Sequence, residues 1–428
     1  MKNNTIAISD IKRTPISSID KLARKILLSV LERIEHGRLT IIDNEQVIQV
    51  GEASKAFNYS AKIWVNDPRF WGDVCFGSSI GAGEAYMQHH WACDDLVSLI
   101  RIFIRNRHVL DRMDNGLARL TKPINKLTHL LRRNSRQGSK KNIAAHYDLG
   151  NDMFSLFLDE TMMYSSGIFE NAQATMKDAS LAKLDRICKK LDLKPSDRVI
   201  EIGTGWGGFA IHAAKHYGCH VTTTTISRQQ YEYAKQRVQE QGLQHQITLL
   251  LKDYRDLEGR YDKLVSIEMI EAVGHQYMDD YFQKCSSLLR PNGMMLIQAI
   301  TIADQRYESA KRSVDFIQKY IFPGGFLPSV TAMSASVTQK TDMRLFHLED
   351  IGPHYATTLL RWREQFFSNL EAIRALGYSD IFIRMWEFYL CYCEAGFEER
   401  VIGNVHALFV KPYCQRDSIL PALEGSKV

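Results

Sequence analysis

The chain has 428 residues and a mass of 49.1 kDa, which is long for one hydrophobic core and indicates two or three domains. Apolar residues make up 45% and charged residues 24%, a composition that excludes wholesale disorder, collagen and coiled coil. No stretch approaches the ~18 consecutive apolar residues of a membrane span. Residues 1–18 lack the apolar run of a signal peptide, so we expect a protein that stays inside the cell.

The net charge of +5 conceals one basic segment, residues 101–141, which we call the basic belt. Only Asp111 and Asp114 oppose its twelve basic residues, so the belt carries +10 and the remaining chain −5. Such a cluster attracts the phosphates of anionic lipid or of nucleic acid. The alternative is a solvated linker without a partner. The basic residues are Arg101, Arg105, Arg107, Arg112, Arg119, Lys122, Lys126, Arg132, Arg133, Arg136, Lys140 and Lys141.

The N-terminal part of the chain predicts a small α+β domain. Residues 39–50 and 61–71 alternate apolar and polar side chains as strands do. Residues 83–106 place apolar side chains at helical spacing. The segment 121–142 is poor in acids and reads as a boundary. We therefore expect an N-terminal domain over 1–120, a basic linker over 121–142 and a larger domain over 143–428.

The larger domain alternates buried-type strands with helices, which predicts an α/β fold with a doubly wound, mostly parallel sheet. Two further strands could close that sheet after two long helical stretches. The segment between Thr301 and Asp342 is too long for a plain loop, so we expect it to line or cover the site. The expected strands are 198–203, 220–226, 246–253, 261–269, 294–300, 344–351 and 406–412.

A glycine run, Gly203-Thr-Gly205-Trp-Gly207-Gly208, follows the first of these strands. Glycines let the backbone approach a ligand closely at the start of a helix. The spacing fits both a dinucleotide loop and, with Glu201, the loop of S-adenosylmethionine (SAM) methyltransferases. A nicotinamide site also needs an acid about twenty residues on, where this chain has only threonines, so SAM is favoured. A structural turn that binds nothing is the remaining alternative.

Several segments together resemble the cyclopropane-fatty-acyl-phospholipid synthases and the related mycolic acid cyclopropane synthases. The resemblance covers nearly all of residues 140–412 and, through residues 83–96, reaches the family's N-terminal lipid-binding domain. It implies a seven-stranded, Rossmann-like methyltransferase sheet. The segments that carry it are 146–154, 162–169, 199–210, 224–230, 266–274, 313–329, 350–362 and 385–400.

The family methylates a carbon–carbon double bond in a phospholipid acyl chain. An alkene is a poor nucleophile, so a sulfonium methyl must be held close and in line with it. Methyl transfer leaves a carbocation that water would trap, so the site should be dry. Aromatic faces stabilise such a cation, and a base must finally remove a proton.

The resemblance also assigns the residues that would hold SAM. Gly203, Gly205 and Gly207 would cradle its methionine part, near Glu201. Thr225, Ser227 and Gln230 replace the usual ribose-binding acid, although the same residues can simply cap a helix. The other expected contacts are Tyr164 and Ser165 to the methionine part, and Asp253 and Tyr254 to the adenine.

For the base, the family uses a bound bicarbonate held by a Cys, a Glu, a His, a backbone amide and a Tyr. Glu271, Tyr355 and Ile300 match the Glu, the Tyr and the amide. Ser166 replaces the Cys and Gln298 the His, which puts ring closure in doubt because Gln cannot carry charge.

Two further residues stay open. Cys393 matches a proposed catalytic Cys, but its aromatic-rich surroundings equally suit a buried structural thiol. Glu268 could pair with Glu271, although the sequence does not fix their separation. The only close cysteine pair, Cys391 and Cys393, has no second pair to complete a zinc spacing, so we expect no metal.

We therefore expect a cytoplasmic enzyme, peripheral on the inner leaflet, that converts the cis double bond of a phospholipid acyl chain to a cyclopropane with SAM and bicarbonate. Its expected partners are a phospholipid membrane and, as the family suggests, a second copy in a homodimer. A methylene- or methyl-branched product is the first alternative. A nucleic-acid methyltransferase and a binding-only module are more distant ones; we expect no nucleic-acid partner, because no aromatic-interleaved basic stripe is present.

Overall fold

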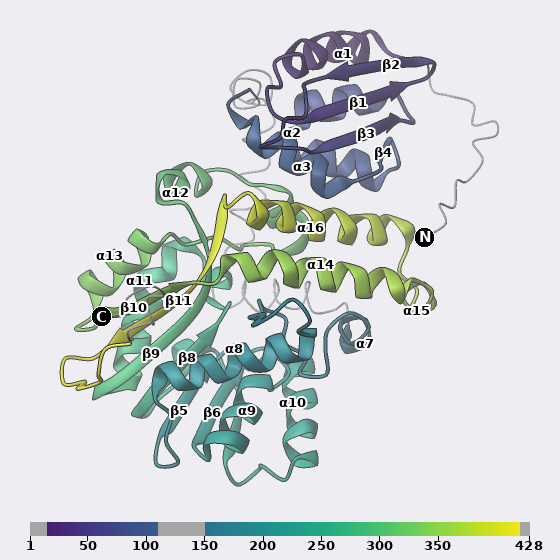
Figure 1. Cartoon of the computed structure of the whole chain (residues 1–428). Helices are drawn as coiled ribbons and strands as arrows, with labels where there is room; N and C mark the ends of the chain where they lie inside the picture. The colour runs from purple at the N-terminus through teal and green to yellow at the C-terminus, as the bar shows by residue number, and fades with distance from the viewer. Residues whose placement is uncertain (1–14, 110–149, 420–428) are drawn as a thin grey trace. The chain divides into compact units, whose positions relative to one another are not determined.

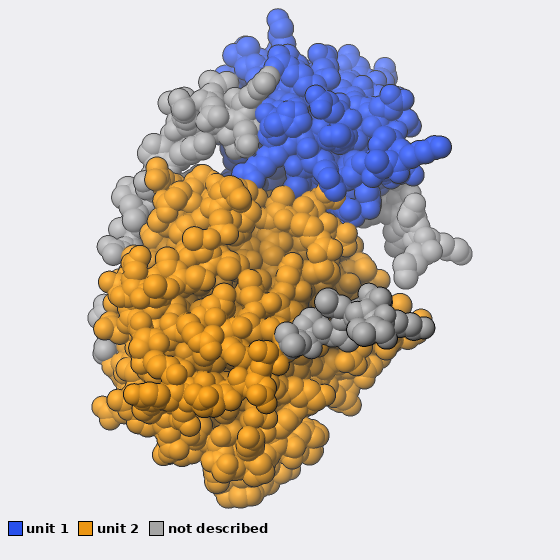
Figure 2. Space-filling view, turned by 60° about the vertical axis from the view of Figure 1, so that its left-hand side comes forward, with its two compact units in different colours: residues 1–123, 379–388 blue, residues 124–378, 389–428 orange. Residues whose placement is uncertain are grey.

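The computed structural model of the chain describes residues 15–109 and 150–419 (Figure 1). The chain divides into two compact units, residues 1–123 with 379–388 and residues 124–378 with 389–428 (Figure 2). The expected linker and most of the basic belt lie outside the described residues; within the belt, Arg101, Arg105 and Arg107 are described. No described helix is both long enough and apolar enough to cross a membrane.

The first unit holds a four-stranded sheet in the order β2-β1-β3-β4. Strands β1 and β3 are parallel, and the two outer strands run antiparallel to their neighbours. The elements of this unit, in chain order, are α1 (Ser18–Leu31), β1 (Arg38–Asp43), β2 (Gln46–Val50), β3 (Ser60–Val65), α2 (Arg69–Met87), β4 (Trp91–Cys93) and α3 (Leu96–Arg105).

Two predictions for this unit need correction. The strand predicted over 61–71 ends at Val65, because Pro68 has the backbone angles of a helix start and α2 begins directly after it. The helix predicted over 83–106 is interrupted by β4. Asp95 then accepts a hydrogen bond from the backbone N–H of Ser98 and so starts α3 as a separate helix.

The second unit is built on a seven-stranded sheet in the order β10-β11-β9-β8-β5-β6-β7, which confirms the predicted mostly parallel α/β fold. The five strands from β9 to β7 are parallel, whereas β11 runs antiparallel to both of its neighbours. The strands are β5 (Arg198–Ile202), β6 (His220–Thr225), β7 (Ile247–Leu251), β8 (Tyr261–Ile267), β9 (Leu289–Ile302), β10 (Arg344–Asp350) and β11 (Ile402–Val410).

Helices cover both faces of this sheet (Figure 1). Met295 and Ile297 of β9 pack in the core with α11 and α13, while Met294 and Leu296 pack in the core with α8 and α9. Strands buried on both faces read as continuous apolar runs, which is why the sequence located them well. The helices after the first unit's α3 are α7 (Gly150–Ser155), α8 (Met176–Leu191), α9 (Gly208–Tyr217), α10 (Arg228–Glu240), α11 (Met278–Leu288), α12 (Asp304–Ala310), α13 (Val330–Lys340), α14 (Gly352–Ser368), α15 (Leu370–Ala375) and α16 (Asp380–Glu398), of which α16 belongs to the first unit up to Phe388.

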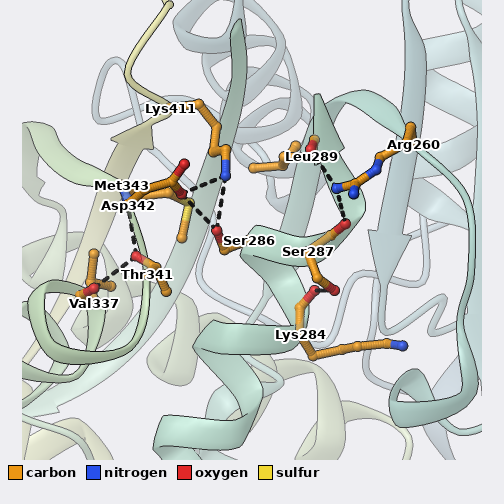
Figure 3. A network of polar contacts seen from close by, with 10 residues as sticks. All are labelled: Arg260, Lys284, Ser286, Ser287, Leu289, Val337, Thr341, Asp342, Met343 and Lys411. Carbon is orange, nitrogen blue, oxygen red and sulfur yellow. Dashed lines mark hydrogen bonds and ion pairs between the residues drawn. The ribbon is translucent and has the colours of Figure 1, made fainter. Parts of the chain in front are cut away.

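A polar network fastens the end of β11 to the rest of the second unit (Figure 3). The Nζ of Lys411 donates to Ser286 Oγ at 3.2 Å and pairs with Asp342, and Ser286 Oγ donates to the same carboxylate at 3.1 Å. Lys411 directly follows Val410, which lies opposite Met294 near the start of β9. The network therefore lies at the amino edge of the parallel strands, and the carboxyl edge remains for ligands.

Candidate functional site

The glycine loop joins β5 to α9 at the carboxyl edge of the sheet. Gly203, Gly205 and Gly207 have φ angles of +103°, +53° and +86°, in the region that favours glycine. A β-carbon on Gly205 would meet no heavy atom within 4 Å, whereas one on Gly203 would meet the side chain of Met269 at 3.2 Å. Backbone N–H groups of the first turn of α9 lie beside this open stretch. The loop can therefore receive a polar ligand group against its backbone.

The carboxyl of Glu201 is buried in β5 beneath the loop. Its Oε2 accepts a hydrogen bond from Thr223 Oγ1 of the neighbouring strand β6 at 2.6 Å. Burial raises the pKa of Glu201 to about 8, against the smaller lowering effects of Thr223 and Lys183. Glu201 is thus a neutral acid below that pH, and its predicted contact with a ligand ammonium stays a prediction.

Thr225, Ser227 and Gln230 lie at the junction of β6 and α10, and all three are buried. Ser227 is the N-cap of α10, and its Oγ accepts from the backbone N–H of Gln230 at 3.3 Å. Thr225 Oγ1 donates to Gln230 Oε1 at 2.9 Å. The capping role is therefore present, and the ribose contact stays a prediction.

The expected adenine-binding pair follows β7, the next strand of the sheet. Asp253 makes a two-pronged ion pair with Arg255, with distances of 2.8 and 2.6 Å to its guanidinium. The ring of Tyr254 packs edge-on against Tyr281, with centroids 5.5 Å apart. Strands β5, β6 and β7 are neighbours, so all the predicted SAM contacts that follow them share one edge of the sheet.

The densest polar cluster at this edge surrounds Glu268, which directly follows β8 and has a φ of +48°, unusual for a side chain other than glycine. Glu268 is half-buried. Both carboxylate oxygens accept hydrogen bonds. The donors come from four separate segments: the backbone N–H of Ser166 (3.1 Å), Nε2 of Gln298 (2.8 Å), Nδ2 of Asn404 (2.6 Å) and the hydroxyl of Tyr355 (2.7 Å).

Glu271 lies one turn further on and has a different environment. Its Oε1 accepts from the backbone N–H of Ile300 at 2.5 Å, and its Oε2 is enclosed without a hydrogen-bond partner among the described residues. Burial, and next the nearby charge of Glu268, raise the pKa of Glu271 to about 8. Glu271 therefore keeps its proton at neutral pH.

A second layer of side chains orients Gln298. Its Oε1 contacts His406 Nε2 at 3.0 Å, and the Nδ1 of His406 contacts Lys190 Nζ at 3.1 Å. Burial lowers the pKa of His406 well below its usual range, so the ring is neutral. Since a lysine ammonium only donates, Nδ1 accepts and Nε2 carries the hydrogen given to Gln298. The amide NH2 of Gln298 is thereby turned towards Glu268.

The hydroxyl groups of Ser165 and Ser166 do not contact the carboxylate of Glu268 directly. Ser166 reaches Glu268 through its backbone N–H, while its hydroxyl donates to the carbonyl of Gly167 at 3.0 Å. Ser165 Oγ accepts from the buried Lys183 Nζ at 2.7 Å. Burial lowers the pKa of Lys183 to about 8, and the charge of Glu268 opposes this shift most strongly. A buried cation therefore belongs to the cluster.

Aromatic rings adjoin the carboxylate cluster. Tyr355 stacks on Phe397 with centroids 4.4 Å apart and meets Trp362 edge-on at 6.1 Å. Tyr164 packs against Trp362 at 5.1 Å, and its hydroxyl lies 2.8 Å from that of Tyr389. These rings place apolar surface, and faces that can stabilise a cation, directly beside the acids.

The long segment between β9 and β10 contacts the same cluster, as the sequence predicted. The backbone N–H of Phe326 donates to the carbonyl of Glu271 at 3.0 Å. The ring of Phe322 lies 6.5 Å from Tyr164 and 6.1 Å from Tyr389, centroid to centroid. The segment therefore lines the site.

Comparison with known proteins identifies the family. Residues 134–407 match the family described as mycolic acid cyclopropane synthetase. The chain is 40% identical to tuberculostearic acid methyltransferase UfaA1 of Mycobacterium tuberculosis (74% of this chain, 75% of that protein), and 37% identical to cyclopropane-fatty-acyl-phospholipid synthase of Escherichia coli K12 (86% and 92%). The chain belongs to the mycolic acid cyclopropane synthetase family.

Solved structures agree with this membership. The mycolic acid cyclopropane synthase CmaA1, complexed with SAH and CTAB, is 30% identical and superposes with a TM-score of 0.60, over 64% of this chain and 98% of that one. The cyclopropane synthase MmaA2 of M. tuberculosis is 28% identical with a TM-score of 0.59, over the same shares. This member of the family is therefore an enzyme of the methyltransferase class.

The structure brings together most of the residues predicted for the base. Ser166, Gln298 and Tyr355 meet at Glu268, and Glu271 meets Ile300 beside them. Their catalytic roles stay predictions. Three of the residues expected to hold bicarbonate (Ser166, Gln298 and Tyr355) bind the carboxylate of Glu268 instead, and the backbone N–H of Ile300 donates to Glu271, so the described residues do not fit that anion.

Sequence reasoning missed Asn404, Lys183 and His406. It considered Glu268 as a partner of Glu271 but assigned it no role. No motif marks Asn404, which reaches the site only because β11 lies beside β9. A usable signal existed for Glu268: it lies near the end of the strand predicted over 261–269, and Gln298 lies near the end of the strand predicted over 294–300. Carboxyl ends of parallel strands meet at one edge, so the two side chains could have been paired.

Cys393 lies on α16, and no hydrogen bond joins it to the acids among the described residues. Burial raises the pKa of its thiol far above the usual range, so the nucleophilic thiolate is absent at neutral pH. This favours the structural interpretation. Within the described ranges, no group of three or more His, Cys, Asp or Glu side chains is arranged to hold a metal ion.

Proposed function

We propose that this enzyme transfers the methyl carbon of SAM to the cis double bond of a phospholipid acyl chain and closes a cyclopropane ring. The observation that carries the proposal is one edge of the sheet that combines an open glycine loop, two neighbouring acids that each accept hydrogen bonds, and a wall of aromatic rings. Family membership and the CmaA1 complex with SAH support SAM as the donor.

The residues at this edge fit SAM. The open side of Gly205 and the first turn of α9 suit the polar methionine part, and Thr225, Ser227 and Asp253 lie at the ends of the next two strands. When bound, SAM supplies an electrophilic methyl group. The protein holds the alkene in line with that methyl group. Such positioning alone makes methyl transfer much faster.

The aromatic and acidic groups fit the later part of the reaction. Tyr164, Trp362 and Tyr355 exclude water from the developing carbocation and present ring faces to it. The carboxyl groups of Glu268 and Glu271 lie beside these rings, where a carboxylate can take up a proton.

A branched product is the second candidate, and one observation favours it. The relative at 40% identity is named a methyltransferase, whereas the relative at 37% is named a cyclopropane synthase. If a hydride first shifts from the methylated carbon to its cationic neighbour, loss of a proton from the new methyl group gives a methylene branch instead of a ring.

Lipid mass spectrometry tests both candidates. Cells that express the enzyme and are fed methyl-labelled methionine should place the label in phospholipid acyl chains. A cyclopropane adds one CH2 and resists mild hydrogenation, a methylene branch adds the same CH2 and takes up hydrogen, and a saturated branch carries two more hydrogens. Absence of label from every acyl chain contradicts the proposal.

The proposal includes binding to the inner leaflet through the N-terminal domain and the basic belt. Ile19 and Leu22 of α1 are 65% and 57% exposed, next to Lys21 and Lys25 on the same helix. An apolar surface bordered by cations suits an anionic bilayer. A homodimer remains part of the family expectation.

Neutralising the belt should weaken membrane binding. Replacing Arg132, Arg133 and Arg136 by Gln should lower partition onto anionic vesicles on the order of 100-fold at low salt, because each cation near such a surface contributes about 1 kcal/mol. Sedimentation with vesicles measures this. The matched control replaces the exposed Lys215, Lys235 and Lys252 by Gln. Equal loss in both triple variants would remove the belt from the proposal.

A further inference from the structure

The proposed reaction ends when a base removes a proton. The hydrogen-bond donors at the carboxyl edge of the sheet indicate where that base is held. A bound anion acting as that base would need several hydrogen-bond donors to hold it. The described residues provide such a set, and it is already engaged: the donors from Ser166, Gln298, Asn404 and Tyr355 converge on one carboxylate, that of Glu268.

We propose that the carboxylate of Glu268 stands in place of bicarbonate and removes the proton that ends the reaction. The inference rests on the proposed function. The methyl carbon bonds to one alkene carbon as its bond to sulfur breaks, which leaves the cation on the neighbouring carbon, and one C–H bond of the new methyl group then breaks. Its electron pair bonds the methyl carbon to the cationic carbon and closes the ring, or, after a hydride shift between the two chain carbons, forms the double bond of a methylene branch. The proton goes to a Glu268 oxygen and returns to water when the product leaves.

The environment of Glu268 suits such a base. A carboxylate is a weak base, but a C–H beside a carbocation is far more acidic than a carboxylic acid, so a weak base is enough. Three hydrogen bonds to Oε1 and one to Oε2 reduce the nucleophilic attack of Glu268 on a sulfonium methyl, while Oε2 keeps a lone pair that can take the proton. Glu271 keeps its proton at neutral pH, so it adds no second negative charge beside Glu268.

The strained backbone of Glu268 favours a role as the base over a purely structural role for this cluster. Glu268 has a φ of +48°, a conformation that glycine adopts without cost. A residue that only linked β8 to the next turn would be better as glycine. The strained backbone is maintained by tertiary contacts and aims the carboxylate at donors from four other segments, namely a loop, β9, β11 and α14, as is common at functional sites.

Glu268→Gly provides the sharpest test, because it relaxes the backbone and leaves an anion-sized gap lined by the same donors. The rate at which the final lipid product forms should fall on the order of 10²–10⁴-fold, the usual contribution of a general base. Added formate or bicarbonate should restore at least a tenth of the wild-type rate. Glu268→Gln should lose activity equally but gain nothing from either anion, because the amide fills the gap.

Three controls make the result decisive. Both variants should bind SAM like the wild type, measured by titration. The exposed Glu258→Gln should keep full activity. The wild type should work equally well in carbonate-free buffer, whereas dependence on added bicarbonate would overturn the proposal. Undiminished activity of Glu268→Gly would overturn it as well.

A readout that needs no turnover separates this inference from the proposed function. Formate should raise the melting temperature of Glu268→Gly and leave those of the wild type and Glu268→Gln unchanged. If the wild type labels no lipid but formate still stabilises Glu268→Gly, the proposed function fails while Glu268 is confirmed as the occupant of an anion site. If formate has no selective effect, Glu268 does not replace an anion.

Discussion

Gly205→Val should weaken SAM binding by at least 100-fold and leave the fold intact. A β-carbon at this position would meet no protein atom within 4 Å, so the new side chain projects into the space where we expect the methionine part of SAM. A hundredfold loss corresponds to about 2.7 kcal/mol. Isothermal titration measures the affinity, and circular dichroism checks the fold.

Gly242→Val is the matched control. Gly242 also has a positive φ, +67°, and an open side, but it follows α10 in a loop away from the glycine run. Both variants therefore incur the same backbone cost of about 1–2 kcal/mol. Only Gly205→Val should lose SAM. Equal affinities in the two variants would show that the loop is a structural turn.

Glu201→Gln should make the protein more stable at alkaline pH. In the unfolded chain this carboxyl ionises near its ordinary pKa of 4.5, whereas burial raises the folded value to about 8. The stability linked to the bound proton is full below 4.5 and is lost as the pH rises to 8. The difference amounts to roughly 5 kcal/mol, at about 1.4 kcal/mol per pKa unit.

The Gln side chain does not titrate and can still accept the hydrogen bond from Thr223. Urea denaturation should therefore find the variant more stable than the wild type at pH 8.5, and nearly equal to it at pH 5. The exposed Glu258→Gln should show no such dependence. A variant that is less stable at both pH values would contradict the buried, neutral state of Glu201. SAM titration of the same variant tests the predicted contact with the ligand ammonium.

The sequence predicted the larger sheet well because its central strands, such as β5 and β9, are buried on both faces and are separated by amphipathic helices. Ser227 could be recognised as an N-cap for the same local reason. The strand predicted over 61–71 is wrong beyond Val65, because a helix begins after Pro68. The alternation of apolar and polar side chains does not reveal that boundary. Local pattern thus located the elements but not every boundary.

The centre of the site could be predicted only in part. The resemblance pointed to Ser166, Gln298 and Tyr355, and the departures at the first two signalled a change in the base. It could not show what replaces the anion, because that depends on the backbone turn at Glu268 and on the register of β11 against β9. Asn404 and His406 take their roles from that register alone.

The position of β11 has a consequence for how the enzyme matures. This strand is synthesised after all the others described, yet it inserts between β10 and β9. Until it emerges from the ribosome, Glu268 lacks Asn404, and the exposed edge of β9 is open to wrong pairing. A nascent chain would therefore be inert towards lipid until the last strand docks, and chaperones would find their main target at that unpaired edge.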